Sequence, residues 1–343
     1  MGELFGPYRV YEQLGAGGMA TVHRAELVAD DGEKQIVALK CLLPELSRNT
    51  SFVRRFIDEA RLGQKLRHAN IAKTFDVGKI DKTHYIALEY VRGPTVQQLF
   101  MRALQGKTMP VFIALHIVTQ TARALAYAHG LREETGRPLN LIHRDIAPSN
   151  IIVSDTGSTK LIDFGVAKTA SGHVRTAAGS IIGKLGYVAP EYLSGKLDAR
   201  VDIYSLGVVA YELLTARKLF DVDDVRTAHQ LRSCEIELPS KINTCVSAGI
   251  DDIVMKALAF DPDARWQSAF DFYTALSDFV HNTGLEVHDR DVAEWIGKEL
   301  DAQVSEPTLP PIRTSEFEID IEAAFARVRA KTHPSIQDEL LTG

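Results

Sequence analysis

The sequence predicts an α+β protein in which strands come first and helices follow. Strand-like stretches at residues 8–14, 21–28 and 35–43 are separated by a glycine cluster and by an Asp-Gly turn signal. Two long apolar helices are expected further on, at residues 112–129 and 201–215. This order of elements indicates a small part built on a sheet and a larger, mainly helical part.

The composition is that of an ordinary globular protein. The chain has 343 residues, 45% hydrophobic and 24% charged, which is long enough for two domains. A net charge of -6 without a basic block argues against a nucleic-acid partner. The cysteines Cys41, Cys234 and Cys245 are odd in number and widely spaced, which favours a reducing compartment over a disulfide framework or a zinc site.

The apolar stretches give no sign of secretion or membrane insertion. Residues 1–5 lack the basic start and the apolar core of a signal peptide. The charge-free stretches at residues 109–122 and 203–211 are too short to cross a bilayer and are more typical of buried helices. We therefore expect a cytoplasmic protein with no membrane span in this chain.

A glycine turn, a lysine and a glutamate together predict a phosphate-binding unit. Glycines between the first two predicted strands would let backbone N–H groups approach phosphate oxygens, although such a turn alone is more typical of a plain hairpin. Lys40 is an isolated cation in the third apolar strand. The helix predicted at residues 51–66 carries Glu59 beside the apolar face of Phe56 and Ala60, where a charge needs a partner, and Lys40 is the obvious candidate.

A polar segment at residues 143–150 carries a carboxylate, Asp145, five residues before the amide of Asn150. A second carboxylate, Asp163, follows in the sequence Asp-Phe-Gly. Such a set can orient a hydroxyl group and hold a divalent metal against phosphate oxygens, and its oxygen ligands suit a hard cation such as Mg²⁺. The spacing carries no meaning by itself, so the interpretation rests on the combination of motifs.

In combination these motifs resemble the eukaryotic-like Ser/Thr protein kinases of bacteria, over residues 8–280. The resemblance implies a two-lobed protein kinase fold. A small, mainly antiparallel β lobe with one key helix would comprise about residues 1–89, followed by a hinge at about 89–94 and a mainly α lobe at about 95–282. Residues 283–343 would form a tail with one or two helices and a proline-containing linker.

The resemblance also implies a role for each residue, with ATP and Mg²⁺ as cofactors. Lys40, held by Glu59, would orient the α- and β-phosphates. Asp145 would orient the substrate hydroxyl and accept its proton, and Asn150 and Asp163 would bind magnesium. The glycine-rich loop, the adenine pocket and the hinge would contribute Gly15, Ala16, Gly17, Gly18, Val22, Ala38, Leu88, Glu89, Val91 and Ile152.

Two positions depart from the family pattern. Ser/Thr kinases usually have lysine where this chain has Ala147, and threonine facing the catalytic aspartate where it has Lys184. We expect the two changes to compensate, with Lys184 supplying the positive charge that Ala147 lacks. The alternative is that Lys184 points to solvent.

Further contacts are implied by the resemblance. Asp202 would hydrogen-bond the backbone of the catalytic loop, and Arg265 would pair with Glu191. The polar segment at residues 130–140 is longer than the family's usual connection and predicts an inserted surface hairpin.

The activation segment and the tail are possible sites of regulation. A phosphate on Thr176 or Ser180 would pair with Arg144 and order the activation segment. In the tail, a helix is predicted at residues 289–303 and a linker at 305–315. We expect the tail helix to pack against the large lobe, with autoinhibition or partner docking as the alternative.

The expected function is transfer of the γ-phosphoryl group of ATP to Ser or Thr hydroxyls of protein substrates. Autophosphorylation, which involves self-association of two copies, is expected as well. A pseudokinase scaffold is the alternative that Ala20 and Ala147 favour, and tyrosine kinases also lack lysine at the position of Ala147. The long activation segment, ending in Ala-Pro-Glu, disfavours a small-molecule kinase.

Overall fold

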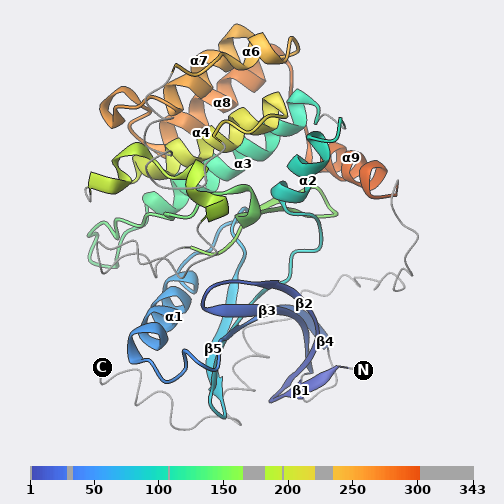
Figure 1. The fold of residues 1–343 in the computed structure, drawn as a ribbon, viewed down its shortest axis with the longest axis vertical. Coiled ribbons are helices and arrows are strands. Elements are labelled where there is room, and N and C mark those ends of the chain that lie inside the picture. Colours follow the sequence, from blue (N-terminus) through green and yellow to red (C-terminus); the bar gives the residue numbers. More distant parts are fainter. Residues whose placement is uncertain are drawn as a thin grey trace. The chain divides into compact units, whose positions relative to one another are not determined.

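The computed structural model describes residues 2–28, 34–106, 109–164, 182–194, 197–220 and 235–301. The chain forms two compact units, which are described separately. Unit 1 contains Met1–Arg67, Lys73–Tyr90 and the chain from Lys298, and unit 2 contains His68–Ala72 and Val91–Gly297. Figure 1 shows that unit 1 is dominated by strands and unit 2 by helices.

Unit 1 is built on a six-stranded antiparallel sheet with the order β1-β2-β3-β4-β6-β5. Alternating apolar residues of β2, β3, β4 and β6 form a buried cluster on one face, which explains why these segments pair as strands. The strands are β1 (Glu3–Phe5), β2 (Tyr8–Ala16), β3 (Ala20–Val28), β4 (Lys34–Leu42), β5 (Thr74–Ile80) and β6 (Thr83–Glu89).

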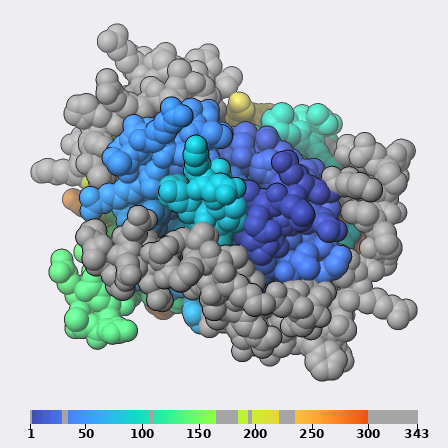
Figure 2. Space-filling view, turned by 90° about the horizontal axis from the view of Figure 1, so that it is seen from below, coloured from blue at the N-terminus to red at the C-terminus, as the bar shows by residue number. Residues whose placement is uncertain are grey.

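Helix α1 (Thr50–Gly63) covers the other apolar cluster of unit 1. Asn49 caps its N-terminus by accepting a hydrogen bond from the backbone N–H of Ser51. Its buried residues Phe56 and Ala60 pack with residues of β3, β4 and β6. Figure 2 shows the β5–β6 hairpin in cyan between α1 in lighter blue and the N-terminal strands in dark blue.

Unit 2 is a helical bundle around α4, which is buried along its whole length. Its helices are α2 (Val96–Ala103), α3 (Val111–His129), α4 (Arg200–Thr215), α6 (Pro239–Ile242), α7 (Ala248–Ala257), α8 (Ala269–Thr283) and α9 (Asp289–Asp301), the last reaching past Gly297. A strand pair, β7 (Ile151–Val153) and β8 (Thr159–Leu161), follows the catalytic-loop segment. The short 3-10 turns are η1 (Pro148–Asn150), η3 (Ile182–Tyr187), η4 (Pro190–Ser194) and η5 (Pro262–Ala264).

Helix α3 is the one helix in the described ranges that is long and apolar enough to cross a membrane. It packs against α4 and α8, and 61% of its most apolar window is buried inside the protein. These contacts are those of a core helix, in agreement with the buried helix expected from the sequence.

The inserted segment after α3 forms the predicted surface hairpin. Arg132 and Pro138 pair as an isolated antiparallel bridge, and the N–H of Glu133 donates to the carbonyl of Arg137 at 2.8 Å. Most of its side chains are exposed, so the insertion adds no core to unit 2.

The first part of the predicted tail packs on unit 2. Val292 and Ile296 of α9 are buried, and His116 of α3 lies 3.1 Å from the carbonyl oxygen of Val287. Gly157, with φ +86°, comes so close to the backbone of Asp289 that a Cβ there would clash. The predicted linker at residues 305–315 lies outside the described residues.

The predicted pair of Arg265 and Glu191 fixes η4 to the segment between α7 and α8. The guanidinium donates to both carboxylate oxygens of Glu191 at 2.7 and 2.8 Å, and it also donates to the carbonyls of Ala259 and Phe260. It lies over the ring of Tyr204 at 4.8 Å. With 1% of its surface exposed, Arg265 is a buried cation whose hydrogen bonds are all internal.

We predict that Arg265→Ala lowers the free energy of unfolding by about 3 to 5 kcal/mol, because it removes a buried cation together with its hydrogen bonds to Glu191, Ala259 and Phe260. The matched control is Arg200→Ala, which breaks ion pairs to Asp198 and Asp263 at the surface. Its expected cost is below about 1 kcal/mol. Urea unfolding measures both, and equal midpoints for the two variants would contradict the prediction.

Candidate active site

Unit 1 forms the predicted ion pair. The Nζ of Lys40 in β4 lies 2.6 Å from Oε1 of Glu59 in α1, and the two side chains are 11% and 13% exposed. The pair needs both the strand register and the packing of α1, because each side chain comes from a separate element. A lysine held in this way presents a fixed positive charge for phosphate oxygens.

The glycine turn between β2 and β3 leaves open space where side chains would stand. A Cβ added to Gly15 would meet no atom within 4 Å, and one added to Gly17 would meet only the carbonyl of Ala20, at 3.8 Å. Internal packing therefore does not explain why glycine stands at either position. The open turn fits a phosphate chain approaching the backbone closely.

The remaining nucleotide-site candidates of unit 1 lie on neighbouring strands. Val22 is paired with Lys40, and Ala38 is paired with Leu88. Glu89 is the last residue of β6, and its carboxylate accepts a hydrogen bond from the N–H of Lys73 at 3.0 Å. Strand register places Val22 of β3 opposite Lys40, and Ala38 stands two residues before Lys40 on the same strand, β4.

In unit 2 the predicted base and amide are joined directly. The Nδ2 of Asn150 donates to the backbone carbonyl of Asp145 at 2.7 Å and to its Oδ2 at 2.9 Å. This leaves the Oδ1 of Asn150 as an acceptor for a cation. Asp163 follows in the same unit with a φ of +55°, a backbone conformation that costs a non-glycine residue energy.

A buried histidine connects the two segments. His143 is fully buried, and its Nε2 lies 3.1 Å from the carbonyl of Ile162, while its Nδ1 accepts from the N–H of Asp145 at 3.3 Å. Burial lowers the pKa of His143, so the ring is neutral with its proton on Nε2. The ring of Phe164 packs against it, with centroids 4.5 Å apart.

Asp202, at the first turn of α4, holds the catalytic-loop backbone as predicted. Its carboxylate accepts from the N–H groups of His143 at 2.7 Å and Arg144 at 2.8 Å, and it contacts Nε2 of His129 at 2.9 Å. Arg144 has φ +62°, in the left-handed region, and the two N–H bonds hold this strained turn. Burial acts to raise the pKa of Asp202, but its interactions with His129 and His143 outweigh burial and lower it.

Lys184 points to the catalytic loop and not to solvent. Its Nζ lies 2.9 Å from Oδ2 of Asp145 and 3.3 Å from Oδ1 of Asn150. The lysine side chain is 32% exposed and that of Asp145 is 19% exposed. The expected position of the cation is therefore confirmed, whereas its effect on the reaction stays a prediction.

The turn η3, which carries Lys184, is anchored to α4 by contacts that the sequence interpretation missed. The hydroxyl of Tyr187 donates to Oε2 of Glu212 at 2.7 Å, and Ser205 donates to the carbonyl of Tyr187 at 2.7 Å. Burial raises the pKa of Glu212 to about 7 and also raises the pKa of Tyr187. The feature of the sequence that could have indicated this contact is a single glutamate within a very apolar helix.

The structure does not test four of the residues predicted from the sequence, two for phosphorylation and two for nucleotide binding. Thr176 and Ser180, the phosphorylation candidates, lie outside the described residues. Ile152 lies on β7 and is bridged to Thr95, and Val91 belongs to unit 2, so their proposed contacts with a nucleotide stay predictions.

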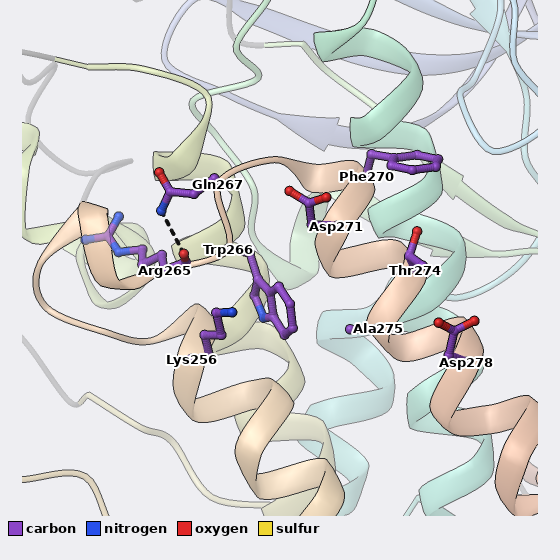
Figure 3. Close-up of a pocket in the computed structure, with 9 residues that line it drawn as sticks. All are labelled: Lys256, Arg265, Trp266, Gln267, Phe270, Asp271, Thr274, Ala275 and Asp278. Carbon is purple, nitrogen blue, oxygen red and sulfur yellow. Dashed lines mark hydrogen bonds between the residues drawn. The ribbon is translucent and has the colours of Figure 1, made fainter.

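A surface pocket of about 440 Å³ lies elsewhere on unit 2, beside the buried Arg265. Figure 3 shows the side chains of Lys256 and Trp266 next to each other in this pocket, with Phe270 and Asp271 on α8. The Nζ of Lys256 stands 3.8 Å from the centre of the indole ring. None of the predicted site residues lines it.

The chain belongs to the protein kinase family, because the protein kinase domain model matches residues 8–274. It is similar to the tyrosine-protein kinase MasK of Myxococcus xanthus, with 37% identity over 80% of this chain and 43% of the relative. It is also similar to the serine/threonine-protein kinase PrkC of Bacillus subtilis, with 36% identity over 78% of this chain and 39% of the relative. The chain thus spans less than half the length of these curated relatives.

Solved structures agree with this membership. The C20A mutant of the PknI kinase domain from Mycobacterium tuberculosis matches with 30% identity and a TM-score of 0.59, covering 81% of this chain and 97% of that one. The two-lobed kinase fold and the resemblance to bacterial Ser/Thr kinases are confirmed.

We predict that Asp202→Asn lowers the free energy of unfolding by roughly 2 to 3 kcal/mol at neutral pH, because an amide cannot accept all three contacts. The pKa of Asp202 is lowered from 3.8 in the folded state, so its contribution is present above that value and lost as the pH falls through the folded pKa. The difference between variant and wild type should therefore shrink in acid. Urea unfolding at several pH values measures it, and a constant difference would refute the assignment.

Glu212 is expected to act in the opposite sense. Its pKa is raised from 4.5 to about 7, so the wild type loses stability as the pH rises through this range. Glu212→Gln cannot ionise and should gain on the wild type by on the order of 3 kcal/mol between pH 4 and pH 8. Glu235→Gln, at an exposed position, is the control. The free energy of unfolding is measured between pH 4 and pH 8, and a difference between Glu212→Gln and wild type that does not change with pH would contradict the prediction.

Proposed function

We propose that this chain is an active ATP-dependent protein kinase that phosphorylates Ser or Thr hydroxyls of proteins, itself included. The observation that carries the proposal is the formed pair of Lys40 and Glu59 together with the joined Asp145 and Asn150. Unit 1 would bind the adenine and the phosphates, and unit 2 would supply the base. We place the protein in the cytoplasm, because ATP is available there and because free cysteines such as Cys41 are typical of a reducing compartment.

The reaction forms one bond and breaks another. The substrate hydroxyl oxygen bonds to the γ-phosphorus, the bond from that phosphorus to the β–γ bridging oxygen breaks, and ADP leaves. Asp145 orients the hydroxyl and takes its proton. Lys40, held by Glu59, fixes the α- and β-phosphates, so positioning and charge neutralisation supply most of the rate.

The residues present fit a magnesium ion. The Oδ1 of Asn150, which accepts from Nζ of Lys184 at 3.3 Å in this structure, and the carboxylate of Asp163 are the hard oxygen ligands that Mg²⁺ takes together with phosphate oxygens. When bound, the ion neutralises phosphate charge. In the part of the chain that is described, no cluster of three or more His, Cys, Asp or Glu residues offers another metal site.

The alanine at the third glycine position does not favour a pseudokinase. Ala20 is 4% exposed, and its methyl group belongs to the buried cluster with Leu42 and Phe56. It therefore fills the core of unit 1 and leaves the open turn at Gly15 and Gly17 free for phosphates.

A tyrosine acceptor is the second candidate. It is favoured by Ala147, because tyrosine kinases also lack lysine there, and by the name of the Myxococcus xanthus relative. The Ser/Thr acceptor is favoured by PrkC of Bacillus subtilis and by PknB of Mycobacterium leprae, two further curated relatives that are named serine/threonine-protein kinases.

The test is incubation of the purified chain with γ-labelled ATP, Mg²⁺ and generic protein substrates, followed by phosphoamino-acid analysis. Wild type should label Ser or Thr, and Asp145→Asn and Lys40→Met should each reduce the rate by about 10²- to 10⁴-fold. Circular dichroism of both variants controls for folding. Absence of label from the wild type would support a pseudokinase, and label on tyrosine would overturn the Ser/Thr acceptor.

A further inference from the structure

We propose that Lys184 is a catalytic residue that contacts the γ-phosphoryl group and replaces the cation missing at Ala147. This inference rests on the proposed kinase function. It places the essential positive charge on the turn η3 and not on the catalytic loop.

The position of the Lys184 ammonium group carries the proposal. Its Nζ lies 2.9 Å from Oδ2 of Asp145 and 3.3 Å from Oδ1 of Asn150. It therefore stands beside both the proposed base and a proposed magnesium ligand. Asp145 would hold the hydroxyl that bonds to the γ-phosphorus, and Asn150 would hold the magnesium ion beside the phosphates. A cation next to both residues is therefore placed to stabilise the charge on the oxygens of the transferred group.

The catalytic loop itself has little to offer in place of this cation. Ala147 is 2% exposed and ends in a methyl group. Between His143 and Asn150 the sequence contains a single basic residue, Arg144, and its backbone is held by Asp202 in a left-handed turn. Lys184 of η3, by comparison, brings its Nζ to 2.9 Å from Oδ2 of Asp145.

A purely structural role explains the Lys184 contacts less well. The ion pair is partly exposed, and pairs of this kind contribute about 1 kcal/mol or less to stability. Asp145 does not depend on it for orientation, because Asn150 already donates to both the side chain and the backbone of Asp145. A weakly stabilising cation directed at the base is better explained by the reaction.

The turn that carries Lys184 is fixed where it stands. Tyr187 follows three residues later, so the two side chains lie on the same side of a 3-10 turn. Tyr187 is tied to α4 by Glu212 and Ser205. The cation is thus positioned by α4 through η3, and it is in place only when η3 is docked.

The test replaces the charge chemically. In Lys184→Cys we expect kcat to fall by about 10²- to 10³-fold, equivalent to about 2.7 to 4.1 kcal/mol, with the KM for ATP changed less than about threefold. Alkylation with 2-bromoethylamine rebuilds an ammonium side chain of nearly the same length and should restore kcat at least tenfold. Alkylation with iodoacetamide adds a neutral group and should restore none.

Three controls make each outcome decisive. Wild type treated with both reagents reports on the other cysteines, Lys79→Cys places the same chemistry at an exposed position, and mass spectrometry confirms full alkylation. A kcat of Lys184→Cys within threefold of wild type, or no rescue by complete aminoethylation, overturns the role of Lys184 alone. A wild type without phosphoryl transfer overturns the proposed function and this inference with it.

Discussion

The carboxylate of Asp202 is the contact on which the active-site half of unit 2 depends. It accepts two successive backbone N–H groups, from His143 and Arg144, and so holds the left-handed turn that directs Asp145. Its place in the first turn of α4 suits a negative charge, because the helix dipole is positive at that end. The hydrogen bonds from its three partners offset the free energy that is lost when this carboxylate is removed from water.

Helix α4 organises more than the catalytic loop. Asp202, Ser205 and Glu212 recur at positions i, i+3 and i+10, which lie on one stripe of a helix with 3.6 residues per turn. Asp202 holds the loop that carries the base, while Ser205 and Glu212 hold the turn that carries Lys184. A single buried helix thus positions both the base and the cation, which lie next to each other.

The sequence predicted contacts best where a charge in an apolar setting had a single plausible partner. Lys40 with Glu59 was predicted on that basis together with the family resemblance, Arg265 with Glu191 was predicted from the resemblance alone, and the structure forms both pairs. The strand β5 was not predicted, because Gly78 and the buried Asp76, which accepts from Tyr85, break its apolar alternation. The three-residue β1 is too short for any periodicity, and its Leu4 is 72% exposed.

The direction of Lys184 illustrates why other features could not be predicted. A lysine side chain has four rotatable bonds, so its sequence position allows both a solvent-facing and a loop-facing conformation. The choice is made by the docking of Tyr187 on α4, a contact between residues 25 positions apart that no local pattern reports. The sequence could show that Ala147 lacks a charge, but only tertiary structure could show where a replacement lies.

Moving a cation from the catalytic loop to η3 changes what controls it. A lysine at position 147 would be fixed whenever the loop is folded, because Asp202 holds that loop directly. Lys184 is fixed only while η3 is docked, and its anchor Glu212 has a pKa of about 7 in a buried site. The protonated acid and the carboxylate bind the Tyr187 hydroxyl differently, since one can donate and the other only accepts. The charge at the active site therefore depends on a contact that lies a full turn away from the chemistry.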